Sequence, residues 1–215
     1  MPAPLRRAFD LLARWRRAPA FHPDGVLYEG RTEVRGPGPL PVGEVDCLVR
    51  LSKGIGTPQG VPDLLGIAVR LLHSPPVDVL ATSAPGGAGW RRFVLRPAAR
   101  WGGTTLTSLM PWVRSGRRLT ALVEAPKGLD SPDPDVLDGR LPLTFRLRVV
   151  DKHGDAQAGT ITILRRSARD RPGFDPVLHA PPSWRLAPAW LSTIRERAYG
   201  GSRRGQEGGT SDRVV

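Results

Sequence analysis

Residues 143–164, LTFRLRVVDKHGDAQAGTITIL, decide the predicted fold because they indicate two β-strands joined by a tight turn. The first strand is expected over residues 143–150. Gly154 marks the turn, and the second strand is expected over residues 160–164, where TITIL is rich in β-branched residues. Such a hairpin predicts antiparallel pairing.

Further strand patterns precede this hairpin along the chain. They are predicted at residues 26–34, 45–52, 67–72, 77–82, 93–96 and 119–124. Residues 104–118 are ambiguous, and a short helix ending in basic residues is the interpretation adopted for them. The 25 glycines and 23 prolines favour many turns and short strands. The sequence therefore predicts an α+β fold, in which residues 26–165 form an antiparallel β-barrel with a helix near each end of the chain.

The two expected helices flank the barrel. Residues 4–18 carry apolar side chains at helical spacing with arginines opposite, and residues 188–199 repeat this spacing with Leu191 and Ile194. The predicted organisation is an N-terminal amphipathic helix within residues 1–20, a barrel domain over residues 21–204 and a disordered tail over residues 205–215.

Charge and cysteine content bear on partners and compartment. The net charge is +12, and three of the 32 basic residues are lysines, which leaves 29 arginines. These arginines are scattered and accompany no nucleic-acid-binding motif, so no specific nucleic-acid partner is expected. Peripheral membrane contact through the N-terminal helix is left open. The single Cys47 excludes an intramolecular disulfide, and the absence of an apolar signal-peptide core predicts a cytoplasmic protein. The sequence does not indicate an oligomeric state.

Arg195 and Tyr199 are the first candidate functional residues. They lie four positions apart, which places them on the same face of the helix expected over residues 188–199. A neighbouring guanidinium stabilises a phenolate, and a phenolate is a ligand that haem iron accepts. A surface tyrosine in a basic helix is the alternative interpretation of these two residues.

Four patches together resemble the catalase family, in that family's order. They are HPDGVLYEGRTEV (22–34); RLS (50–52) with DLLGIAVR (63–70); VDVL (77–80) with Pro85; and FDP (174–176) with Leu191, Arg195, Tyr199 and Arg204. The chain resembles a minimal member of that family, without counterparts of its N-terminal arm and C-terminal domain. Thr82 or Ser83 stands where the family has its distal asparagine. Pro19 and Gln206 stand where the family has two further arginines.

The resemblance implies a haem cofactor and a peroxide or organic hydroperoxide as substrate. Tyr199 would ligate the iron, and Arg195 would keep its phenol ionised. His22 would be the distal general base, and Ser52 would hydrogen-bond it. Arg50 and Arg204 would pair the haem propionates.

Other functional classes stay open at this point. A catalase-fold barrel could hold haem or another apolar ligand without turnover. A hydrolase such as a phosphodiesterase would need clustered metal ligands, whereas the four histidines, His22, His73, His153 and His179, are far apart in the sequence. Nucleic-acid binding through net charge alone is a further alternative.

Overall fold

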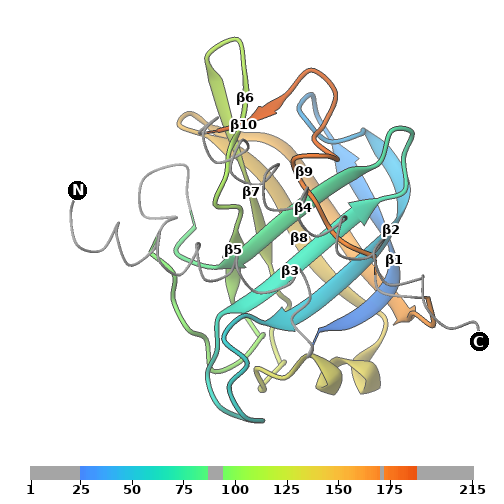
Figure 1. The fold of residues 1–215 in the computed structure, drawn as a ribbon, viewed down its shortest axis with the longest axis vertical. Helices are drawn as coiled ribbons and strands as arrows, with labels where there is room; N and C mark the ends of the chain where they lie inside the picture. The colour runs from blue at the N-terminus through green and yellow to red at the C-terminus, as the bar shows by residue number, and fades with distance from the viewer. Residues whose placement is uncertain (1–24, 87–93, 170–171, 188–215) are drawn as a thin grey trace, which may run out of the picture.

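The structure is a computed structural model that describes residues 25–86, 94–169 and 172–187. Its centre is an antiparallel β-barrel, closed in the order β7-β5-β4-β3-β2-β1-β9-β8 by pairing between β7 and β8 (Figure 1). The barrel strands are β1 (Val26–Arg35), β2 (Gly43–Lys53), β3 (Leu65–Leu71), β4 (Val77–Ser83), β5 (Thr105–Thr107), β7 (Arg117–Glu124), β8 (Leu143–Asp151) and β9 (Gly154–Arg166). The predicted antiparallel barrel is therefore confirmed.

Alternation of side chains along each strand fills the barrel interior. On β2, for example, Cys47, Val49 and Leu51 point inward, and so the residues between them lie on the outer face. The interior holds the largest buried side chains, among them Trp101, Tyr28 and Phe145. These side chains fill the interior of the eight-stranded barrel, so a ligand site is expected on its outer surface.

Cys47 behaves as one of the apolar core residues. Its side chain is buried, and burial raises the pKa of the thiol to about 12. A thiol that stays protonated at neutral pH is a poor nucleophile.

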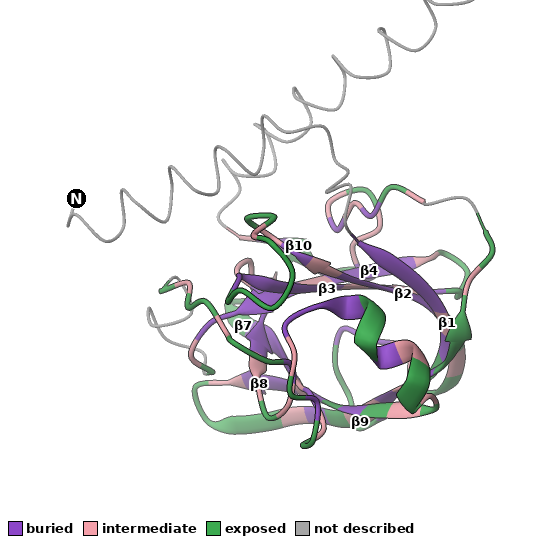
Figure 2. Cartoon of the chain, turned by 90° about the horizontal axis from the view of Figure 1, so that it is seen from below, coloured by how far each residue is buried: buried purple, intermediate pink, exposed green. Residues whose placement is uncertain are grey.

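The 3₁₀-helix η2 (Pro134–Arg140) covers one end of the barrel, as the end-on view shows (Figure 2). Buried Tyr28 donates a hydrogen bond from its hydroxyl to the carbonyl oxygen of Pro134, at 2.7 Å. Nearby, the ammonium of Lys53 contacts Asp133 Oδ1 at 2.8 Å, and both side chains are buried. These contacts fix η2 against the ends of β1 and β2.

The short helix predicted over residues 104–118 is wrong. These residues contain β5, β6 (Trp112–Arg114) and the start of β7. Between β6 and β7, Ser115 and Gly116 have φ angles of 48° and 78°, so both lie in the left-handed region that a tight hairpin turn requires. The cross-strand pair of Trp112 and Leu119 then buries both side chains, which a lone helix here would not achieve.

The strand predicted at residues 93–96 is also wrong, because residues 94–96, the part that the structure describes, form no strand. Arg96 N donates to Ser83 O at 2.9 Å, but Pro97 follows and has no N–H with which to extend a ladder. A two-residue strand that the sequence did not reveal, β10 (Arg185–Leu186), pairs with β6 instead.

The flanking helices expected over residues 4–18 and 188–199, and the tail expected over residues 205–215, lie outside the described residues. Within the part of the chain that the structure describes, no helix has the length and apolar character needed to cross a membrane.

Candidate functional site

Residues 167–187 follow β9 and cross the outer face of β1–β4 on their way to β6 (Figure 1). We call them the crossing segment; residues 170 and 171 of it are not described. Ser167 N donates to Leu27 O on β1 at 2.8 Å, and Ala187 N donates to Pro111 O beside β6 at 3.0 Å. The chain thus returns across four strands, which brings the FDP motif onto the barrel.

A buried carboxylate anchors the crossing segment. Asp78, on the outer face of β4, accepts hydrogen bonds from Asp175 N at 2.7 Å and from the Arg70 guanidinium at 2.6 and 2.7 Å. His179 Nδ1 lies 3.0 Å from the same carboxylate. Arg70 Nη2 donates its two hydrogens to Asp78 and to Gly173 O, so it has none left to donate to His179 Nδ1. Nδ1 of His179 is therefore assigned the hydrogen, which it donates to Asp78.

An apolar row lies beside this anchor. Cross-strand register places three apolar residues in one row, Leu27 on β1, Ala68 on β3 and Leu80 on β4. Arg50, on β2, lies in the same row between Leu27 and Ala68. Phe174 of the crossing segment packs with Leu27 and Leu48, and Ala68 and Leu80 adjoin this cluster. The outer face of the barrel therefore carries a second apolar cluster, separate from the interior core.

A row of small polar residues runs parallel to the apolar row. Ser52, Gly66 and Thr82 are register partners on β2, β3 and β4. A Cβ atom at Gly66 would lie 3.1 Å from Ser52 Oγ, so glycine keeps the surface between the two hydroxyl groups low. Gly66 and Thr82 are buried, and Ser52 is partly exposed.

The register also separates Thr82 from Ser83. Thr82 lies on the outer face with Ser52, and its hydroxyl donates to Leu65 O at 3.1 Å. Ser83 points inward, and its hydroxyl accepts a hydrogen bond from Leu65 N at 3.1 Å. Thr82 is thus the residue that occupies the outer-face position.

Arg50 lies on β2, beside the residue that precedes β1. Its side chain is buried, and a Cβ atom at Gly25 would lie 2.3 Å from Arg50 Nε. Glycine at position 25 therefore lets the guanidinium pass directly beside the chain that enters β1.

The structure brings together two of the residues predicted for the site. Arg50 and Ser52 share the outer face of β2, as the alternation of that strand predicts. His22, Arg195, Tyr199 and Arg204 lie outside the described residues. Sequence reasoning missed Phe174 as an apolar contact and Asp78 as an anchor, although the FDP and VDVL patches contain both.

No protein-family model matches the chain, and no curated protein matches it in sequence. Among the described residues, no three or more His, Cys, Asp or Glu side chains gather in a group that could hold a metal ion.

Proposed function

We propose that this protein is a catalase-like haem protein that processes hydrogen peroxide or organic hydroperoxides. One observation carries the proposal. The patches of the resemblance at residues 22–34, 50–52, 63–70 and 77–80 fall largely on four adjacent strands, β1 to β4. Their outward residues form the apolar row and the polar row of one surface, and the FDP patch packs against it.

The residues on this surface fit haem. A porphyrin has two flat apolar faces and an edge with two carboxylates, so it requires an apolar surface with a cation at its margin. Ala68 and Leu80, which are partly exposed, would supply the apolar contact, and Arg50 would supply a guanidinium beside them.

Chain connectivity is compatible with the proposed role of His22. It lies three positions before Gly25, which limits the distance between their Cα atoms to about 11 Å. Gly25 itself lies against Arg50.

Each residue then has one task in the proposal. Haem, when bound, supplies the redox chemistry. Tyr199 is the proposed iron ligand, with Arg195 stabilising its phenolate. His22 accepts a proton from the hydroperoxide and returns it to the departing oxygen, which an imidazole can do near neutral pH. Ser52 orients His22, and Arg50 and Arg204 pair the propionates.

A haem carrier without turnover is the second candidate. It is favoured by Thr82, whose hydroxyl hydrogen is directed to Leu65 O and is therefore not available to a bound peroxide. This candidate shares the surface and the ligand and differs only in the chemistry.

Titration with haemin, followed through the Soret band, tests the proposal. The chain has two tyrosines, Tyr28 and Tyr199, which provide a matched pair of variants. Tyr199→Phe should abolish or displace the band because it removes the ligating oxygen. Tyr28→Phe should leave the band unchanged, since that hydroxyl is bonded to Pro134 inside the barrel. Equal effects of the two variants, or no specific band with the wild type, would reject haem binding.

Activity distinguishes the two candidates. His22→Ala should keep the Soret band and lose at least about a hundredfold in peroxide-dependent oxidation, which is the lower end of the range for a general base. The control is His153→Ala, because His153 is exposed on the β8–β9 hairpin. Haem uptake with no turnover in the wild type would favour the carrier.

A further inference from the structure

A three-stranded ribbon extends the barrel sheet beyond β7. It consists of β10, β6 and the first residues of β7. Trp112 pairs with Leu119 and Leu186, and all three side chains are buried. On the opposite face, Val113 pairs with Arg118 and Arg185. The ribbon thus has one apolar face toward the barrel and one face with two arginines.

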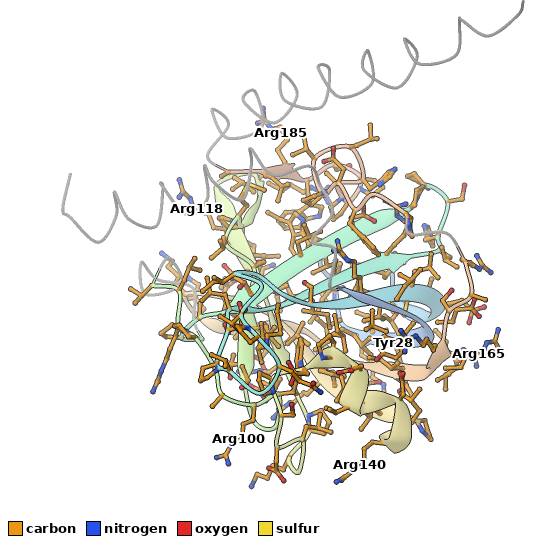
Figure 3. All side chains as sticks on the ribbon, turned by 60° about the horizontal axis from the view of Figure 1, so that its bottom comes forward. Tyr28, Arg100, Arg118, Arg140, Arg165 and Arg185 are labelled. Atoms are coloured by element: carbon orange, nitrogen blue, oxygen red, sulfur yellow. The ribbon has the colours of Figure 1, made fainter. Side chains whose placement is uncertain are left out.

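The two arginines of this face lie on either side of β6. Arg118 and Arg185 flank Val113 on either side, so their Cα atoms are separated by two interstrand spacings, about 10 Å. Both side chains project outward from the same end of the molecule (Figure 3). Arg114, at the end of β6, lies on the other face, the one that carries Trp112. It is exposed, with its guanidinium 6.0 Å from the centre of the Trp184 ring.

Three positive charges of the ribbon are not compensated by any described residue. Arg114, Arg118 and Arg185 form no ion pair with any described residue, whereas Arg31, Arg148 and Arg165 on other strands each contact a carboxylate. The sequence explains the contrast. Residues 79–123 contain seven arginines and no Asp or Glu, and residues 176–195 also contain no Asp or Glu.

Like charges add to this excess at the hairpin. Arg114 lies directly opposite Arg117 across the β6–β7 turn, an arrangement that is unfavourable without a counter-charge. Arg117 has Asp151 at 2.9 Å, but the other three arginines have no such partner among the described residues. Anions bound at the ribbon would relieve this repulsion.

We propose that the ribbon binds the sugar-phosphate backbone of nucleic acid, through Arg118 and Arg185 on one face and Arg114 beside its turn. Guanidinium groups pair well with phosphate oxygens. None of the exposed large apolar residues among those described lies on the ribbon, and both Trp112 and Trp184 are buried. The surface therefore lacks the apolar side chains that insert into a lipid bilayer.

Binding at the ribbon is independent of base sequence. The ribbon offers charge and no set of amide or carboxylate side chains that would read base edges. Affinity should therefore fall steeply with salt, because each neutralised phosphate releases counterions, with a slope of about −0.9 per phosphate contact on duplex DNA.

The test measures binding of the full chain, without added haem, to a fluorescent 20-base-pair DNA duplex of mixed sequence, by anisotropy over a series of salt concentrations. The ribbon variant is Arg114→Gln with Arg118→Gln and Arg185→Gln. The matched control is Arg100→Gln with Lys127→Gln and Arg140→Gln. It removes the same charge from exposed residues that make no ion pair with a described residue. Figure 3 shows Arg100 and Arg140 at the other end of the molecule.

The ribbon variant should bind at least tenfold more weakly than the wild type at 100 mM salt, and its salt slope should fall by about 2 to 3. The control should stay within threefold of the wild type. Equal losses in both variants would overturn the proposal, since net charge alone would then explain binding. Absence of duplex binding by the wild type would also overturn it. So would stronger binding to vesicles of phosphatidylcholine and phosphatidylglycerol than to DNA. Thermal melting of both variants checks that each remains folded.

Discussion

At the scale of single residues, Asp78 holds the crossing segment to the barrel. Its carboxylate is fully buried on the outer side of β4 and contacts Arg70, His179 and the backbone of Asp175. The Arg70 guanidinium also lies 5.3 Å from the centre of the Phe174 ring. Loss of this carboxylate would leave Arg70 without its counter-charge and the segment without its anchor.

Asp78→Ala should lower the free energy of unfolding by about 3 to 5 kcal/mol, the range for removing one partner of a buried ion pair. Asp46→Ala is the control, because Asp46 also pairs with an arginine, Arg31, but its side chain is 68 % exposed. The control should change stability by less than about 1 kcal/mol. Urea denaturation measures both, and equal losses would show that Asp78 does not anchor the segment.

At the scale of elements, the loop between β2 and β3 is organised around the buried carboxylate of Asp63. Ile55 N donates to its Oδ1 at 2.7 Å, and Thr57 N and Oγ1 donate to its Oδ2 at 2.7 and 2.8 Å. Burial alone would raise the pKa of this carboxyl, but these hydrogen bonds together hold the pKa below its ordinary value. The ionised carboxylate of Asp63 therefore stabilises the loop.

This lowered pKa has a defined consequence for acid stability. Above the unfolded pKa of about 3.9 the stabilisation is fully present, and it is lost as the pH falls through the lower pKa of the folded state. Asp63→Asn should therefore lower stability at pH 7 and flatten the dependence of unfolding free energy on pH below about 4. The control is Asp130→Asn, at an exposed aspartate that makes no ion pair with a described residue. An unchanged pH profile for Asp63→Asn would contradict this assignment.

The elements themselves differed in how far the sequence predicted them. The strands β1–β4, β7, β8 and β9 were all expected, although with shorter bounds, because each has a run of inward-facing apolar residues. The short strands β5 and β6 were missed, since three residues carry too little periodic signal. The turn at Ser115 and Gly116 was the available clue, because Ser-Gly marks a turn.

At the scale of the whole molecule, antiparallel pairing of β1 to β4 brings separate sequence patches side by side. Alternation placed Arg50 and Ser52 on one face of β2, and this could be predicted from the sequence. The cross-strand rows could not be predicted, because the register of each pair depends on the turn type and length of the loop that joins the two strands. The path of the crossing segment was equally hidden, since it depends on Asp78 meeting Asp175 across 97 positions.

The most direct test of the proposed haem surface is methyl NMR of the labelled protein during titration with haemin. Ferric iron broadens the signals of nearby methyl groups. The account predicts strong broadening for Ala68 and Thr82, which lie on the outer face of β3 and β4. Thr144 and Thr162 serve as controls, because they are hydrogen-bonded to each other on the outer face of β8 and β9. Broadening of Ala68 and Thr82 with sharp Thr144 and Thr162 signals would support the site, whereas equal broadening of all four, or none, would contradict it.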